Sequence, residues 1–152
     1  MPLSSAQIGR CGELLVQYEL LMLGVESAAL STDAGIDLVA YAPNAVAAQT
    51  IQVKANYKSK PSGGRGKAAL DWWIPEDNPA QLVGLVGLSS KRIWVFLKAE
   101  LAALAQQKSS GRLHLYMYTD PSHQPKKEGR LAHSHEFEKY KLENRAARLF
   151  AV

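Results

Sequence analysis

The chain has 152 residues, of which 47% are hydrophobic and 21% are charged. This composition is typical of one folded domain and excludes a disordered chain. The single cysteine, Cys11, excludes an internal disulfide, and cysteine and histidine together lack the number and spacing of a structural zinc site. The sequence contains neither a signal-peptide pattern nor an apolar run of about 18 residues that could span a bilayer. We expect a single cytoplasmic domain over residues 1–152 with no membrane partner.

The net charge of +4 is unevenly distributed along the chain. Between Cys11 and Val53 there are five acidic residues and no basic one, whereas Lys54 to Lys67 contains five basic residues and no acidic one. An acidic group can hold a cation and a basic segment can hold phosphates, so this order favours a metal-dependent site that acts on nucleic acid. Ordinary variation of surface charge is the alternative explanation.

The first predicted element is a helix over about residues 5–23. Ser4 and Gln7 have the spacing of a capping box, apolar residues follow at intervals of three and four, and Gly24 is a natural stop. Gly9 and Gly12 each weaken a helix interior by about 1 kcal/mol relative to alanine, which indicates that another element packs closely there. Three short β-like segments come next and suggest a meander: residues 25–30, 36–41 and 50–55.

The second half begins with a basic loop. Residues 56–68 contain three glycines, two serines and a proline without apolar periodicity, so we expect this loop to be flexible. Residues 71–79 have no clear assignment. The remaining predicted elements are a hairpin of strands over 81–88 and 92–97, a helix over 98–107, a strand over 114–118 and a closing amphipathic helix over 136–150. Together they predict an α/β fold with a mixed sheet flanked by helices.

Polar side chains interrupt two of the predicted strands. Side chains alternate along a strand, so Asp37 points away from its apolar neighbours, and Gln52 and Lys54 share one face of their own strand. If the two strands pair with their apolar faces aligned, Asp37, Gln52 and Lys54 converge, Glu13 of the helix could reach the same patch, and the Val53 carbonyl would face it. Hard oxygen ligands bind Mg²⁺, and a lysine orients water and offsets negative charge, so this set suits phosphodiester hydrolysis.

This pattern resembles the PD-(D/E)XK nuclease superfamily, which has the restriction-endonuclease-like fold. The matching stretch covers residues 8–55 and contains a Gly-Glu pair in the helix, a Gly-Ile-Asp strand start and a Gln-Val-Lys strand. The resemblance implies a helix-first mixed sheet in which Asp37 and Gln52 bind the metal, Lys54 is the catalytic lysine and Glu13 is the auxiliary acid. Gln52 stands where the family usually has an acid, a variation that is similar to Mrr-like restriction enzymes.

We therefore expect an endonuclease that cuts duplex or branched DNA with Mg²⁺, Mn²⁺ being a possible substitute. Double-strand cleavage by one such site is awkward, so the resemblance also implies a homodimer or a higher oligomer. A non-catalytic nucleic-acid-binding or assembly module that retains the fold is the competing class. Loop residues that are candidate contacts to DNA phosphates, rather than simply solubilising a hinge, are Lys58, Lys60, Arg65 and Lys67.

Two adjacent tryptophans, Trp72 and Trp73, have no role in that site. Adjacent tryptophans usually divide between the core and an interface, and stacking on bases, as in single-strand binders, is the alternative. We expect a core or dimer contact for this pair.

Overall fold

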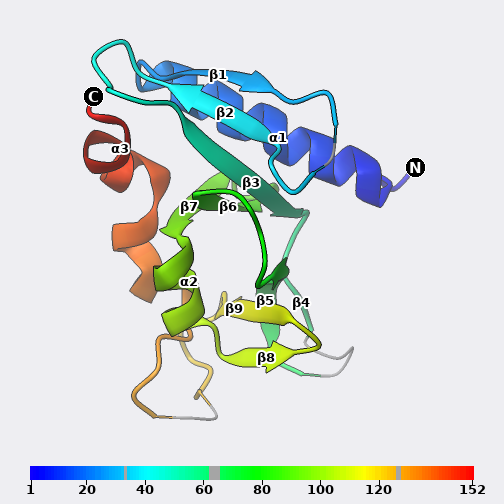
Figure 1. Ribbon diagram of the computed structural model, residues 1–152. Helices are drawn as coiled ribbons and strands as arrows, with labels where there is room; N and C mark the ends of the chain where they lie inside the picture. Colours follow the sequence, from blue (N-terminus) through cyan, green and yellow to red (C-terminus); the bar gives the residue numbers. More distant parts are fainter. Residues whose placement is uncertain (33, 62–65, 126–127) are drawn as a thin grey trace.

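The computed structural model describes residues 1–32, 34–61, 66–125 and 128–152. Within these residues, a long helix is followed by the strands of two sheets and by further helices (Figure 1). The helices are α1 (Ser5–Met22), α2 (Lys98–Leu104), the 3-10 helix η2 (Ser134–Tyr140) and α3 (Leu142–Phe150). The strands are β1 (Glu26–Ala29), β2 (Leu38–Tyr41), β3 (Gln49–Asn56), β4 (Lys60–Pro61), β5 (Ala68–Pro75), β6 (Leu82–Gly87), β7 (Arg92–Leu97), β8 (Gln107–Ser109) and β9 (Arg112–Tyr118).

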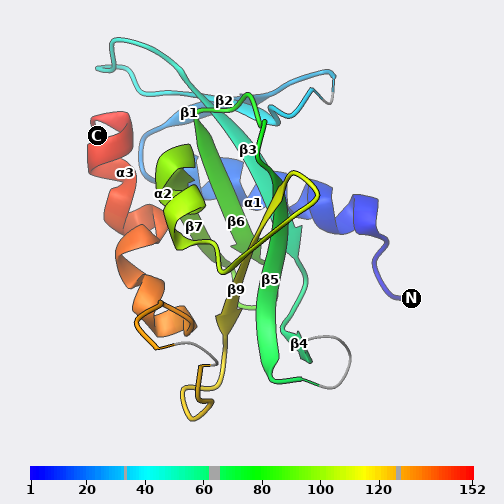
Figure 2. The same ribbon diagram turned by 60° about the horizontal axis from the view of Figure 1, so that its bottom comes forward.

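The first sheet of the described chain has five strands in the order β1-β2-β3-β6-β7. Its neighbouring strands are antiparallel except β3 and β6, which pair in parallel from Ile51↔Leu82 to Asn56↔Gly87. A parallel pair requires a crossover, and this crossover carries β4 and β5 of the second sheet. That sheet, again in the described part, has four antiparallel strands in the order β4-β5-β9-β8. Figure 2 shows its long strands β5 and β9 side by side.

Two hydrophobic cores lie on the two faces of the five-stranded sheet. On one face, Val16 and Leu20 of α1 and Phe150 of α3 form a cluster with Leu38 and Ile51 of the sheet. On the other face, side chains of β6 and β7 pack against β5, β9 and α2, and the largest of them are Trp72, Trp94, Phe96, Leu115 and Met117. Strands β6 and β7 are therefore buried on both faces, whereas β1 at one edge of the sheet is largely exposed.

A buried ion pair connects α3 to α2 and β7. Arg145 of α3 is 5% exposed and donates to the two carboxylate oxygens of Glu100 at 2.7 and 2.8 Å. It also donates to the Val95 carbonyl oxygen at 2.7 Å. Burial opposes ionisation of Glu100, but the hydrogen bonds from Arg145 and from the Leu97 amide outweigh it and lower the pKa of this carboxyl. The bidentate geometry makes this a strong, orienting contact.

The helix-first mixed α/β fold predicted from the sequence is confirmed. The unassigned segment 71–79 supplies most of β5, because Leu70, Trp72 and Ile74 alternate into the second core. The strands predicted in the second half divide between the two sheets, since β9 pairs with β5 and not with β7. Across the described residues, no helix is long and apolar enough to cross a membrane.

Three predicted boundaries are wrong. The helix predicted over 98–107 ends at Leu104, because Gln107 begins β8 and pairs with His114 of β9. Within the expected loop over 56–68, Lys60 and Pro61 form β4 by pairing with Ala69 and Ala68, while residues 62–65 lie outside the described part. The closing helix predicted over 136–150 is interrupted at Lys141, which is extended and bridges to Trp94 of β7. In all three places, backbone pairing with a strand that is distant or later in the chain replaces the structure that the local pattern suggests.

Gly12 allows a close approach of α1 to β3. A Cβ at this position would lie 2.5 Å from the Cβ of Ala55, whereas a Cβ at Gly9 would meet nothing within 4 Å. The close packing predicted from the two glycines is thus confirmed at Gly12 and wrong at Gly9. The contact fixes the first half of α1 against the end of β3 that carries Val53 and Ala55.

Replacing each glycine with alanine should change the free energy of unfolding in opposite directions. Gly12→Ala overpacks the contact with Ala55 at a cost of about 1–3 kcal/mol, which is expected to exceed the gain in helix propensity of up to about 1 kcal/mol. Gly9→Ala gains the propensity without a clash. Urea denaturation measures both, and Gly12→Ala with Ala55→Gly should recover most of the loss. Equal stability of the two single variants would contradict the close approach.

Candidate functional site

Strand β3 extends beyond β2 and leaves an open edge. The β2–β3 ladder ends at Leu38↔Ile51, so the following residues of β3 have β6 on one side and, among the described residues, no strand on the other. Asp37 lies along this edge: its amide donates to the Ile51 carbonyl oxygen at 2.9 Å, and its Oδ2 accepts from the Val53 amide at 2.6 Å. The Asp37 carboxylate is thereby placed beside the residue that separates Gln52 from Lys54.

The backbone of Val53 adds a second oxygen at this edge. The amide and the carbonyl of a strand residue point to the same side, because a ladder residue exchanges both hydrogen bonds with one partner. Since the Val53 amide donates to Asp37, the Val53 carbonyl is directed to the edge on which that carboxylate lies. Two of the oxygen atoms in the predicted metal-binding set therefore share one edge of the sheet.

Gln52 and Lys54 lie on the face of β3 that is turned towards the second core. They are in register with Val83 and Leu85 of β6, which belong to that core. Gln52 is 5% exposed and its Oε1 accepts a hydrogen bond from Nδ2 of Asn78, whereas Lys54 is half-buried. The structure thus places the Asp37 carboxylate at the Val53 amide, between Gln52 and Lys54 in the middle of β3.

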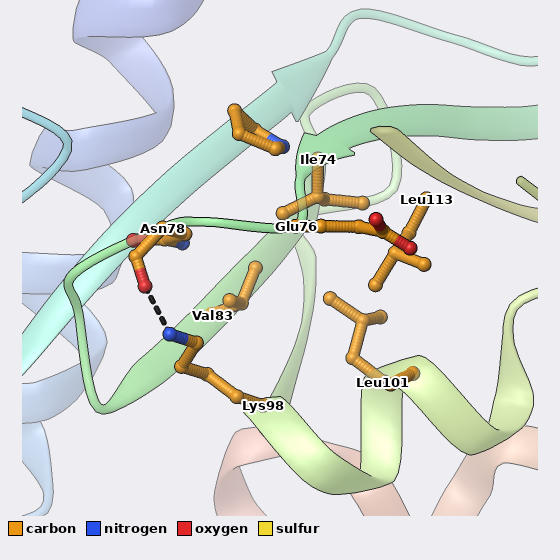
Figure 3. A pocket seen from close by; sticks show the side chains of 9 residues that line it. Ile74, Glu76, Asn78, Val83, Lys98, Leu101 and Leu113 are labelled. Atoms are coloured by element: carbon orange, nitrogen blue, oxygen red, sulfur yellow. Dashed lines mark hydrogen bonds between the residues drawn. The ribbon is translucent and has the colours of Figure 1, made fainter. Parts of the chain in front are cut away.

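Asn78 and Lys98, which the sequence did not indicate, support Gln52. Asn78 is 3% exposed, and its Oδ1 also accepts from the Ala80 amide at 2.8 Å. Its backbone carbonyl accepts a hydrogen bond from the ammonium of Lys98, at the start of α2 (Figure 3). The Asn-Pro pair at this position signals a turn, but nothing in the sequence shows that its side chain reaches β3.

A pocket of about 240 Å³ opens beside this network (Figure 3). Its walls are mainly apolar side chains of the two sheets and α2, namely Ile74, Val83, Leu101, Ala102 and Leu113. Glu76, Asn78 and Lys98 supply its polar groups. Among the described residues that line it, none belongs to the predicted site, and Asn78 connects the pocket to Gln52.

Glu13 is separated from Gln52 and Lys54 by the sheet. Its helix packs on the apolar face of β3, and its carboxylate forms an ion pair with Arg10 at 2.7 Å. The described residues contain no group of three or more His, Cys, Asp or Glu side chains arranged to hold a metal ion. A cation at the open edge would be held by the Asp37 carboxylate, the Gln52 amide oxygen and the Val53 carbonyl. Such a donor set fits Mg²⁺, which binds one or two carboxylates and keeps several waters.

The basic residues predicted to contact DNA lie beside the second sheet. Lys58 is exposed after the end of β3, and Lys60 is exposed on β4. Lys60 and Lys67 line a hollow on the outer face of the four-stranded sheet, the face turned away from the second core. Arg65 lies outside the described residues. Two of the four predicted phosphate contacts therefore border a surface that the sequence did not single out.

A histidine and an aspartate pair on this outer face. His114 of β9 stacks on Trp73 with ring centroids 4.1 Å apart, and its Nε2 lies 2.9 Å from Oδ2 of Asp71 on β5. The hydrogen bond to His114 outweighs burial and lowers the pKa of Asp71, with smaller contributions from the charges of His114 and Lys60. The predicted core contact is confirmed for Trp72, which is buried in the second core. Trp73 instead lies on the outer face, stacked on His114.

The sequence matches no protein-family model and no curated protein. The fold is similar to that of a solved bacterial homing endonuclease, with a TM-score of 0.55 and 17% sequence identity. The similarity covers 81% of this chain and 83% of that chain. At this identity the likeness concerns the fold alone, and it shows that the chain has a nuclease-like α/β fold.

Truncating Asn78 should destabilise the candidate site. Asn78→Ala leaves the buried Gln52 amide oxygen and the Ala80 amide without the partners they have in the structure, and each unsatisfied buried group costs about 1–3 kcal/mol. Asn44→Ala, at an exposed loop position, is the matched control and should change stability by less than about 0.5 kcal/mol. Urea denaturation distinguishes them. If Asn78→Ala is as stable as the unaltered protein, Asn78 does not support Gln52 as the structure indicates.

The Asp71–His114 pair should make the protein more sensitive to acid. Because the folded pKa of Asp71 lies below its ordinary value of 3.8, the pair contributes stability above that value and loses it as the pH falls through the lowered pKa. Asp71→Asn should therefore reduce the free energy of unfolding near neutral pH and flatten its decline below about pH 4. Denaturation at several pH values measures this. Asp77→Asn, at an exposed position, is the control and should leave the profile unchanged.

Proposed function

We propose that the chain is a metal-dependent endonuclease that hydrolyses DNA phosphodiester bonds, with the site at the open edge of β3. The observation that carries the proposal is the hydrogen bond of the Asp37 carboxylate to the Val53 amide at 2.6 Å, which sets an acid beside the Gln-Val-Lys segment. The nuclease-like fold supports it. So does the resemblance of residues 8–55 to the PD-(D/E)XK superfamily, in which these positions form the metal site.

In this proposal Asp37, Gln52 and the Val53 carbonyl hold Mg²⁺, or Mn²⁺ in its place. When bound there, such a cation would polarise the phosphate and make the attacking water more acidic. Lys54 orients that water and offsets the negative charge that develops on the phosphate. Lys54 is half-buried and lies two positions from Gln52, on the same face of β3. Glu13 is proposed as the auxiliary acid. Its helix packs on the other face of β3 from Gln52 and Lys54, so this role requires it to leave its ion pair with Arg10 and to reach around the open edge.

The proposed substrate is duplex or branched DNA, contacted through its phosphates by Lys58, Lys60 and Lys67. Phosphate contacts of this kind add affinity roughly in proportion to the charges they neutralise. We propose a homodimer or a higher homo-oligomer, because cutting both strands of a duplex requires two sites of this type.

The second candidate function is a non-catalytic nucleic-acid-binding module that retains the fold. It is favoured by one observation: the Gln52 amide oxygen already accepts a hydrogen bond from Asn78. An amide oxygen has two lone pairs, so this contact lowers the affinity for a cation without blocking it. Binding of the cation therefore separates the two candidates.

Substitution of Lys54 should abolish cleavage without abolishing binding. With Mg²⁺ or Mn²⁺, the unaltered protein is expected to cut supercoiled plasmid or branched DNA, and EDTA should stop it. Lys54→Ala should lower the cleavage rate by about 10²- to 10³-fold, the loss typical of removing one charge-stabilising group. Lys139→Ala, an exposed lysine of η2, is the matched control. Unchanged cutting by Lys54→Ala would remove the role assigned to this lysine.

Cation binding is measured separately, as the change in melting temperature when Mg²⁺ or Mn²⁺ is added to the protein. A cation that binds only the folded state raises the melting temperature, and Asp37→Asn should abolish this rise. Asparagine keeps an oxygen that can accept from the Val53 amide, so the variant tests the charge rather than the fold. Salt-sensitive DNA binding without cutting and without a cation-dependent rise would favour the non-catalytic module.

A further inference from the structure

The outer face of the four-stranded sheet contains a hollow of about 610 Å³. Its floor is made by β5 and β9, while β4 and β8 contribute residues at its sides. The residues that line it are Lys60, Pro61, Gly66, Lys67, Ala69, Asp71, Trp73, Gln107, His114, Tyr116 and Tyr118. A volume of this size is in the range of small-molecule and cofactor sites.

The floor of the hollow is aromatic because alternate residues of β5 and β9 point outwards. Tyr116 is half-buried at its centre, and its ring lies 5.3 Å from that of Tyr118 and 5.7 Å from that of His114. The stacking of His114 on Trp73 holds the next ring in place. Ala69, opposite Tyr118 in the ladder, is buried and packs with Tyr118 and Ala132 beside the hollow. The face thus presents ordered rings with room beside them.

The charge on this face is mainly positive. Lys60 and Lys67 line the hollow, and Arg112 lies over the Trp73 ring at 5.1 Å from its centroid. Lys67 lies 5.4 Å from the centroid of Tyr118 and donates to the Gln124 carbonyl oxygen. Among the described lining residues Asp71 is the only carboxylate, and His114 hydrogen-bonds to it. A ligand with both an anionic group and a flat ring satisfies this combination.

We propose that this hollow binds an unpaired nucleotide of a single-stranded nucleic acid, with its base against Tyr116 and its phosphates at Lys60 and Lys67. Bases of a single strand stack on aromatic side chains, whereas the faces of paired bases are covered by their neighbours in the duplex. A second copy of the chain fits less well, because a two-fold contact would bring Lys60, Lys67 and Arg112 close to like charges. The proposal concerns binding alone and holds whether or not the Asp37–Lys54 site cuts DNA.

The test is binding of a fluorescently labelled oligothymidylate, followed by anisotropy in EDTA so that cleavage plays no part. Binding of the single strand should depend on Tyr116, whereas binding of a duplex of the same length, which is proposed to lie at the open edge of β3, should not. Tyr116→Ala should weaken binding of the single strand by about 5- to 150-fold, the range for loss of one base–aromatic stack. Tyr18→Ala, an exposed tyrosine of α1 (58% exposed), is the matched control and should bind as the unaltered protein does.

Two further variants keep the test independent of folding. Tyr116→Phe retains the ring and should bind normally, whereas Tyr116→Leu fills similar space without a flat ring and should bind weakly. Lys60→Ala should reduce the slope of log K against log salt by about 0.7, as expected for one phosphate contact to a single strand. The proposal is overturned if Tyr116→Ala and Tyr116→Leu bind the single strand like the control, if Tyr116→Ala weakens duplex binding as much as single-strand binding, or if Tyr116→Leu changes the oligomeric state and not binding.

Discussion

Burial of β3 on both faces constrains every polar group that this strand carries. Its apolar side chains pack under α1 and α3, so Gln52 and Lys54 are turned towards the second core. A buried amide without a partner is costly, and the turn between β5 and β6 supplies Asn78 as that partner. The same turn is held by the Ala80 amide and by Lys98 of α2. The position of Gln52 therefore depends on Asn78 and its contacts with Ala80 and Lys98 as much as on β3 itself.

The open edge of β3 imposes a second constraint. Unpaired backbone groups on a sheet edge invite pairing with another chain, and here the Asp37 carboxylate covers the Val53 amide. An ionised carboxylate has two oxygens and about four lone-pair sites, so satisfying this amide and binding a cation are compatible roles. The structural need to cap the edge thus places an acid where the proposed chemistry requires one.

The part of the fold that follows from local pattern could be predicted from the sequence. The capping box at Ser4, the stop at Gly24 and the period-2 alternation around Asp37 and Gln52 are local signals, and the corresponding elements form close to the predicted bounds. Strand β5 was missed although Leu70, Trp72 and Ile74 alternate correctly, because Pro75 and the charged residues after it resemble a turn. The break at Lys141 depends on a bridge to Trp94, which no local pattern contains.

In the candidate site, too, residues marked by local sequence patterns could be predicted, whereas residues that act through distant contacts could not. Asp37, Gln52 and Lys54 were found because strand alternation and the family resemblance both mark them. Asn78 and Lys98 could not be found, because their contacts join segments separated by 20 or more positions in the chain. The outer face was not predicted: Lys60 and Lys67 were expected only as loop contacts to phosphates, and the floor of the face depends on the pairing of β5 with β9, in which Trp73 is opposite His114.

The two proposed surfaces meet at one hydrogen bond. The Asn56 side chain donates to the Asp71 carbonyl oxygen at 2.5 Å, and Asn56 lies two residues beyond Lys54 on the same face, about 7 Å along the strand. Asp71 in turn directs its side chain into the aromatic hollow. A nucleic acid that occupied both surfaces would place a phosphate at Lys54 and an unpaired base at Tyr116 across this short connection. Such a substrate has duplex and single strand next to each other, so the arrangement favours branched DNA over a continuous duplex.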